Sequence, residues 1–232
     1  MKKNTIGWSL FSRRQIVLLT VYISVFSVAA IAGNTTKKTD EIKNAPVFSK
    51  FVYQGNDRVY NENPLKADEF YNPILQGCYP DPSITRKGSD YYLVCSSFAM
   101  FPGVPVFHSK DLVNWTQVGH VLDRKSQLKV QDTGISAGIY APTIRYNPYN
   151  DTFYMITTQF AGGMGNIIVK TKDPFQGWSD PIQLKFDGID PSIFFDEDGK
   201  AYVVHNDAPD KGKELYTGHR VIKVWEYDVE KD

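Results

Sequence analysis

The sequence predicts an all-β protein of the β-propeller type. A motif of the form x-Pro-Ser/Thr-Ile occurs three times, at 81–84, 141–144 and 190–193. Each copy is followed by a turn and then by a strand rich in aromatic and β-branched residues, and no amphipathic helix pattern separates the copies. Repeats made of strands and turns at this spacing indicate propeller blades. A β-sandwich is the alternative, but a sandwich has no reason to repeat a motif.

The strands are expected directly after the turns that follow each motif. We expect turns at 86–89, 147–151 and 196–199, followed by strands at 90–94, 152–157 and 200–204, with a further strand at 221–227. The motif prolines are 60 and 49 residues apart, and two Lys-Asp pairs, at 110–111 and 172–173, repeat at a spacing of 62. Residues 70–232 therefore amount to about three blades, whereas propellers have about four to eight. The expectation is a propeller truncated to about its first three blades.

The first 32 residues have the layout of a secretory signal peptide. Residues 1–15 carry four basic and no acidic side chains, and 16–32 form an uncharged, mostly apolar run of 17 residues that ends in Ala-Ile-Ala. This run is also close to the shortest length of a membrane-spanning helix, so an uncleaved N-terminal anchor is the alternative. Both interpretations predict an exported protein (periplasmic, cell-surface or extracellular).

Residues 33–69 are polar and weakly patterned, which predicts a linker or N-terminal extension before the main domain at 70–232. The chain has 26 basic and 26 acidic residues; without the first 32 residues, 22 basic remain against 26 acidic, a net charge of −4. Such a balance does not suggest nucleic acid or anionic lipid as a partner. We expect no nucleic-acid binding, and no membrane contact other than through the N-terminal segment if it stays uncleaved as an anchor.

Asp81 stands between Pro80 and Pro82, which predicts a stiff and extended backbone, because proline disfavours the helical region for the residue before it. Asp190 occupies the equivalent position in the third motif, and Ala141 replaces the acid in the second. Equivalent strands of a propeller line its axis, so Asp81 and Asp190 are expected to face each other across the mouth of the channel. The alternative is two turn acids that bond their own backbone.

Four stretches resemble glycoside hydrolase family 43: 72–84, which contains Tyr-Pro-Asp-Pro-Ser-Ile, then 96–115, 138–146 and 188–194, in the order of the family's first three blades. That family is a five-bladed propeller of inverting β-xylosidases, α-L-arabinofuranosidases and arabinanases. The Phe-Pro-Gly-Val-Pro stretch at 101–105 is most similar to the β-xylosidase-like members. The resemblance implies a glycosidase that hydrolyses xylo- or arabino-oligosaccharides of plant polysaccharides such as xylan.

The resemblance also implies roles for four residues. Asp81 matches the general base that activates water, and Asp190 matches the residue that tunes the pKa of the general acid. Phe98 and Tyr140 fall where the family places aromatic rings against the sugar, with core packing as the alternative for Phe98. Inverting hydrolysis needs two carboxyl groups about 6.5–9.5 Å apart on opposite faces of the sugar, and a nearby carboxylate raises the pKa of the acid.

The family's general acid is a Glu in a Glu-Gly-Pro-like motif of the next blade, and these 232 residues contain no such motif. Glu214 and Glu226 lack that context. The chain is therefore expected to be an incomplete fragment without turnover of its own. A non-catalytic carbohydrate-binding propeller is the alternative function.

The remaining candidates are a histidine and two cysteines. His205, at the end of an inner-type strand, is a candidate for lining the site. Export permits a disulfide between Cys78 and Cys95, but two free, buried cysteines are the expected state. No His and Cys cluster has metal-ligand spacing, so neither a metal nor another cofactor is expected in this chain.

Overall fold

The computed structural model describes residues 57–129, 134–160 and 164–232. The expected signal peptide or anchor at 1–32 and most of the expected linker at 33–69 lie outside these residues. The chain divides into two compact units, Met1–Phe70 and Tyr71–Asp232. The described part of the first unit contains a short helix, α2 (Arg58–Glu62), which buries none of its side chains. No helix within the described residues is long and apolar enough to cross a membrane.

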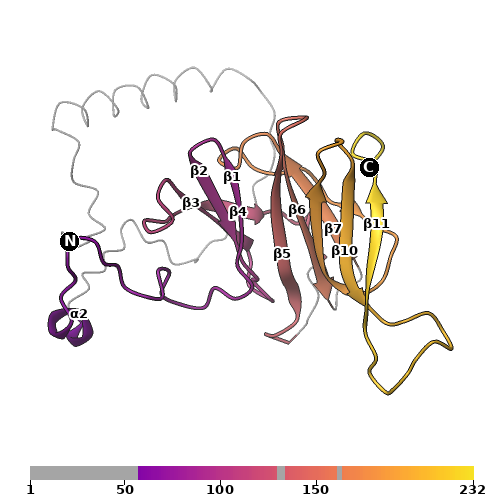
Figure 1. Ribbon diagram of the computed structural model, residues 1–232, viewed down its shortest axis with the longest axis horizontal. Coiled ribbons are helices and arrows are strands. Elements are labelled where there is room, and N and C mark those ends of the chain that lie inside the picture. Colours follow the sequence, from indigo (N-terminus) through magenta and orange to yellow (C-terminus); the bar gives the residue numbers. More distant parts are fainter. Residues whose placement is uncertain (1–56, 130–133, 161–163) are drawn as a thin grey trace, which may run out of the picture. The chain divides into compact units, whose positions relative to one another are not determined.

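The second unit consists of antiparallel sheets that follow one another along the chain (Figure 1). The first sheet contains β1 (Ser83–Lys87), β2 (Asp90–Val94), β3 (Gly103–Ser109) and β4 (Thr116–Leu122). The second contains β5 (Gly138–Asn147), β6 (Thr152–Phe160), β7 (Gly165–Thr171) and β8 (Ile182–Gln183). The third contains β9 (Ile189–Phe195), β10 (Ala201–Asp207) and β11 (Val221–Tyr227). Each sheet pairs its strands in chain order, as a propeller blade does, so the predicted all-β propeller class is confirmed.

The expected strands begin and end close to the observed ones. β2 and β11 have the predicted bounds, and β6 and β10 each continue three residues further than predicted. The hairpin between β1 and β2 turns at Gly88 with φ +60°, and that between β9 and β10 turns at Gly199 with φ +83°. Glycine adopts such left-handed backbone without steric cost, which explains why these turns are tight.

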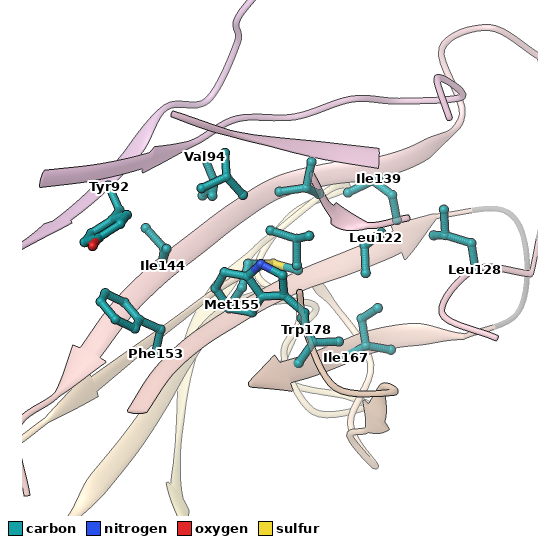
Figure 2. Packing of buried hydrophobic residues seen from close by; sticks show 14 of the residues in the cluster. Tyr92, Val94, Leu122, Leu128, Ile139, Ile144, Phe153, Met155, Ile167 and Trp178 are labelled. Atoms are coloured by element: carbon teal, nitrogen blue, oxygen red, sulfur yellow. The ribbon is translucent and has the colours of Figure 1, made fainter. Parts of the chain in front are cut away.

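The second blade is buried on both faces, and β6 shows this most clearly. Along β6 every residue from Thr152 to Gln159 is buried. Phe153 and Met155 point into the core shared with the first blade, and Figure 2 shows them among the other side chains of that core. Tyr154 and Ile156 point into the core shared with the third blade. Successive side chains of a strand point to opposite faces, so one strand serves two cores.

The outer faces of the first and third blades differ. On the first blade, Leu75 and Tyr79 from the segment before β1 pack against buried residues of β2 and β3. On the third blade, Phe194, Ile222 and Val224 remain 42%, 71% and 60% exposed. The third blade therefore presents an apolar face to solvent within the part of the chain that is described.

The first strands of successive blades lie next to one another, with β1 against β5 and β5 against β9. Two hydroxyl groups of β1 hold β5 directly. The Ser83 hydroxyl accepts a hydrogen bond from the backbone N–H of Ile144 at 3.1 Å, and the Thr85 hydroxyl accepts one from Tyr146 at 2.9 Å. From the first of these bonds to the second, the residue number rises by two in both strands, so β1 and β5 run in the same direction.

Candidate active site

The x-Pro dipeptide of each repeat forms a β-bulge. In the second blade, residues 141–142 of β5 lie opposite a single residue of β6, Thr157. In the third blade, residues 190–191 of β9 lie opposite His205 of β10. Two residues facing one is the defining feature of a bulge, which bends the strand and redirects its side chains.

The first blade has the same arrangement immediately before β1. The Ser96 N–H donates to the carbonyl of Pro80 at 3.0 Å. Because β1 pairs with β2 from residue 83 onward, residues 81–82 lie opposite Cys95. The three motifs that repeat in the sequence are therefore three copies of one backbone feature.

The first residue of every bulge has a left-handed backbone. The φ angle is +53° at Asp81, +39° at Ala141 and +55° at Asp190. The expectation of an extended Asp81 is therefore wrong, because the register of two paired strands outweighs the local preference before proline. A left-handed residue other than glycine costs about 1–2 kcal/mol, and such strain is concentrated at functional sites.

The carboxylate of Asp81 is held by a buried serine. Asp81 Oδ2 accepts a hydrogen bond from the Ser96 hydroxyl at 2.6 Å. The same hydroxyl oxygen accepts a hydrogen bond from the backbone N–H of Ala141 at 2.7 Å. Ser96 is 1% exposed, whereas Asp81 is an exposed residue. One oxygen of a solvent-accessible acid is thus fixed by a contact that spans two blades.

Asp190 is also exposed, but its carboxylate makes no hydrogen bond or ion pair to the described residues. The backbone leading to it is held instead. Gly188, at φ +97°, approaches β10 so closely that a Cβ would lie 2.5 Å from the carbonyl oxygen of Asn206 and 2.6 Å from Nδ1 of His205. A glycine is required at this position for both reasons.

The Asp190 bulge lies at the same end of the blades as the other two. Asn166 of β7 pairs with Thr158 of β6, which is next to the bulge of the second blade. The Thr158 hydroxyl donates to Asn166 Oδ1 at 2.7 Å, and the Asn166 amide donates to the carbonyl of Gly188 at 3.3 Å. These bonds bring the segment before Asp190 to what we call the bulge end of the blades.

Phe98 and Tyr140 lie against each other at the bulge end, with ring centroids 5.5 Å apart and planes at 71°. The backbone of Phe98 exchanges two hydrogen bonds of 3.0 Å with Ile139. Gly138 permits this approach, because a Cβ there would lie 2.2 Å from the Phe98 carbonyl oxygen. A third ring, Phe160, lies 5.4 Å from Tyr140 and is 52% exposed. The three rings form a partly open apolar wall.

His205 does not line an open surface, because it is only 1% exposed. The indole N–H of Trp225 donates to His205 Nε2 at 2.8 Å, and an indole can only donate, so Nε2 carries no proton. The ring of Phe186 stacks on the imidazole at a centroid distance of 4.3 Å. Burial lowers the pKa of His205 below its ordinary value of 6.5, so the ring is neutral at pH 7. His205 packs against Gly188 and thereby supports the Asp190 bulge.

The two glutamates weighed as acids lie in different places. Glu226 pairs with Tyr202 at the end of the third blade opposite the bulge, and its carboxylate lies 3.7 Å from Lys200 Nζ. Glu214 lies in the loop between β10 and β11 and accepts a hydrogen bond from the Gly212 N–H at 2.8 Å. No group of three or more His, Cys, Asp or Glu among the described residues is arranged to hold a metal ion.

Both cysteines are free. Cys95 is buried, and burial raises the pKa of its thiol to about 11. Cys78 is exposed, so the expectation of two buried cysteines is wrong for Cys78. It lies in the segment before β1, which packs on the first blade through Leu75 and Tyr79 instead.

Sequence reasoning missed Ser96 and Phe160. A signal for Ser96 was present, since it follows the predicted strand 90–94 at the position that Thr158 and Asn206 hold in the other two repeats. Phe160 is the last residue of β6, and no motif marks it.

Three antiparallel blades, with a carboxylate in the bulge of the first and of the third, define a β-propeller with an acidic site at one end. A sequence model described as "Glycosyl hydrolases family 43" matches residues 70–231. The chain belongs to this family, and the resemblance that its motifs indicated is confirmed.

Individual relatives agree with this assignment. The chain is 55% identical over 162 residues to a xylosidase/arabinosidase of Butyrivibrio fibrisolvens, a match that covers 68% of the chain and 30% of the relative. It is 47% identical over 146 residues to a non-reducing end α-L-arabinofuranosidase of Bacteroides ovatus, covering 62% and 27%. Among solved structures, a GH43_12 protein retrieved from a capybara gut metagenome superposes with a TM-score of 0.72 at 70% identity, covering 77% of the chain and 33% of that structure. The chain thus spans about a third of the length of these relatives.

Proposed function

We propose that this chain belongs to an exported glycoside hydrolase that releases xylose or arabinose from oligosaccharides of plant polysaccharides with inversion at the anomeric carbon. Asp81 is the general base and Asp190 raises the pKa of the general acid. The single observation that carries the proposal is the Asp81 carboxylate, which is exposed at the bulge end while one of its oxygens is fixed by Ser96.

This arrangement suits a base that deprotonates water. A general base must keep its acceptor oxygen about 2.6–3.2 Å from the proton donor, in a defined direction. Asp81 Oδ2 is engaged with Ser96, and Oδ1 accepts no hydrogen bond from the described residues. A water molecule bound to Oδ1 would transfer a proton to Asp81. At the same time the water oxygen would attack the anomeric carbon from the side opposite the leaving group.

Asp190 acts through its charge. Its exposed carboxylate lies at the same end of the blades and carries no counter-ion among the described residues. A negative charge near a second carboxyl group disfavours ionisation of that group and so raises its pKa. The second carboxyl group is the general acid. No described glutamate combines the bulge end with a Glu-Gly-Pro context, so we propose that hydrolysis needs an acid that these three blades do not supply.

The substrate class follows from the aromatic wall and from the relatives. Phe98, Tyr140 and Phe160 offer partly exposed apolar rings close to the bulge of the second blade, whose Ala141 N–H bonds to the Ser96 hydroxyl that holds Asp81. Apolar ring faces combined with carboxylates suit a sugar, which has an apolar face and hydroxyl groups at its edge. The relatives named for xylosidase and arabinofuranosidase activity support a pentose as the sugar that binds against this wall.

Export is supported by the basic, acid-free start of the chain and by the apolar run at 16–32. Expression of the natural gene with a C-terminal tag in a bacterial host tests it. We expect the tagged protein outside the cytoplasm, and an N-terminus shortened by about 32 residues if the segment is cleaved as a signal peptide. A full-length cytoplasmic product would contradict export.

The hydrolytic function is tested with the natural full-length protein and aryl β-xylosides and α-L-arabinofuranosides. We expect release of the aryl group from at least one of the two, and proton NMR should show the sugar first appearing with inverted anomeric configuration. Retention of configuration, or no hydrolysis of either compound, would contradict the proposal.

A non-catalytic sugar-binding propeller is the second candidate, because residues 1–232 contain no Glu-Gly-Pro segment. The purified chain of residues 33–232 separates the two candidates when it is compared with the natural full-length protein. Binding of xylo-oligosaccharides without hydrolysis by either protein would favour the binding module, whereas hydrolysis by the full-length protein alone would favour the enzyme. Turnover by residues 33–232 would show that the acid lies within them.

A further inference from the structure

We propose that Ser96 is a positioning residue for the reaction, which fixes the Asp81 carboxylate against the second blade and selects Oδ1 as the oxygen that takes the proton from water. This inference rests on the proposed role of Asp81 as the general base. Ser96 does not touch the reacting atoms, and it acts through Asp81.

The direction of each hydrogen bond follows from the donor inventory. A serine hydroxyl has one proton to donate and two lone pairs to accept. The backbone N–H of Ala141 can only donate, so the Ser96 oxygen accepts that bond, which is 2.7 Å long. The carboxylate of Asp81 can only accept, so the hydroxyl proton points to Oδ2 at 2.6 Å. Both groups that Ser96 contacts therefore favour the same orientation of its hydroxyl.

Ser96 is itself held firmly. It is 1% exposed, and its own N–H donates to the carbonyl of Pro80 at 3.0 Å. Ser96 therefore bonds to both residues of the Pro80-Asp81 dipeptide: its backbone N–H bonds to Pro80, and its hydroxyl bonds to Asp81. An exposed aspartate otherwise rotates freely about its side-chain bonds, and this contact removes that rotation.

The anchor extends across the boundary between blades. The N–H that reaches Ser96 belongs to Ala141, the first residue of the bulge in the second blade, where φ is +39°. Because that strained backbone aims the N–H at Ser96, the second motif contributes a backbone donor although it carries no acid. The position of the base in the first blade consequently depends on the bulge of the second.

The equivalent positions in the other blades make different contacts. The Thr158 hydroxyl donates to Asn166 of its own blade at 2.7 Å. The side-chain oxygen of Asn206 accepts a hydrogen bond from Arg220 of its own blade at 2.7 Å. Of the two bulges that carry an acid, the first has its acid bonded to this residue, Ser96, whereas the Asn206 side chain of the third bonds to Arg220 instead of Asp190. The contact is therefore specific to the first blade and is not a general requirement of the fold.

The test compares three variants of the natural full-length protein on the better of the two aryl glycosides. Ser96→Ala should lower kcat by about 10- to 100-fold, because a misplacement of about 1 Å costs about 100-fold, and should change KM by less than about 3-fold. Ser96→Thr keeps the hydroxyl and should retain clearly more of kcat than Ser96→Ala. The matched control is Ser83→Ala, which removes a hydroxyl that accepts from the β5 backbone at Ile144 but does not contact Asp81; it should stay within about 3-fold of the wild type.

A second readout does not depend on activity. Amide hydrogen exchange measured by NMR on the 232-residue chain should show faster exchange at Ala141 in Ser96→Ala, because its N–H loses its acceptor, and faster exchange at Ile144 in Ser83→Ala. Unchanged exchange at Ala141 in Ser96→Ala would overturn the contact on which the proposal is built.

The outcomes separate this inference from the proposed function. If Asp81→Asn is inactive and Ser96→Ala keeps its kcat, Ser96 does not position the base. If Ser83→Ala loses as much as Ser96→Ala, or if Ser96→Thr is no better than Ser96→Ala, the effect is one of blade packing, and the inference is overturned. If Asp81→Asn retains full activity, the base has been wrongly assigned and the proposed function fails first, whatever Ser96→Ala does.

Discussion

Asp81 in the first blade and Asp190 in the third are each the first residue of a β-bulge, with φ angles of +53° and +55°. Their side chains, however, make different contacts. The carboxylate of Asp81 is bonded to Ser96, and through it to the second blade. The carboxylate of Asp190 has no partner among the described residues, and the tight packing lies beneath its backbone, where Gly188 meets His205.

The difference matches the two roles that we propose. A proton can be taken from water only along a hydrogen bond of defined length and direction, so a base gains from a fixed side chain. A charge that raises the pKa of a neighbouring acid acts through Coulomb's law, which depends on distance and not on orientation. Such a residue needs a backbone in the right place more than it needs a fixed side chain.

The largest expected effect separates the two acids directly. In the natural full-length protein, Asp81→Asn should lower kcat by about 10²- to 10⁴-fold at every pH, because it removes general base catalysis. Asp190→Asn should lower activity by about 10-fold at neutral pH for each unit by which the pKa of the acid falls. A lower pKa leaves less of the acid protonated, so the alkaline limb of the rate profile should move to lower pH and the loss should shrink on acidification. The measurement is kcat against pH for both variants. Identical profiles would remove the distinction between the two acids.

The next effect concerns the packing beneath Asp190. Gly188→Ala should destabilise the 232-residue chain by about 2–5 kcal/mol, because the new Cβ meets a backbone carbonyl and the residue stays at positive φ. The matched control is Gly199→Ala in the same blade, where φ is +83° and no atom lies within 4 Å of the added Cβ, so only the backbone cost of about 1 kcal/mol remains. Unfolding in urea measures both. Equal losses would show that the contact with His205 and Asn206 does not support the bulge.

The smallest expected effect is the pH dependence that His205 gives to stability. Burial lowers its pKa in the folded protein, so below about pH 6.5 the unfolded chain binds the proton more readily than the folded one. Stability should therefore fall as pH decreases through this window, by at most about 1.4 kcal/mol per pH unit from this group. His205→Gln should make this part of the profile less steep than it is in the unsubstituted chain. A slope unaltered by His205→Gln would show that the buried imidazole is not the group responsible.

Much of the fold was predictable because its determinants are local. Turn residues and aromatic strands alternate so regularly that β2 and β11 have their predicted bounds, and the equivalence of Asp81, Ala141 and Asp190 was visible in the motif itself. The backbone conformation of these residues could not be predicted from the motif. The proline after Asp81 indicated an extended backbone, and the pairing of two strands with different numbers of residues imposed a left-handed one.

The candidate site also contains residues that the sequence identified and residues that only the structure revealed. The acids and two of the rings were found from motifs, whereas Ser96 and Phe160 were not, because their importance depends on contacts with residues far away in the chain. Ser96 and Ala141 are 45 residues apart, and their bond exists because β1 and β5 lie side by side. Likewise, His205 was expected to line the site from the end of an inner strand, but it lies within β10, the middle strand of its sheet, and Trp225 and Phe186 enclose it from two other segments and keep it away from solvent.

The sequence by itself determined that this chain is built from repeated antiparallel blades and that two of its repeats carry an acid before proline. Strand length, turn chemistry and motif spacing are properties of neighbouring residues, and these decide which segments become strands. The tertiary structure alone decided which acid is fixed and which has no partner among the described residues, and which ring is open and which is buried. Those properties arise from the register between strands and the contact between blades, where each residue's partner is chosen by the fold and not by its neighbours in sequence.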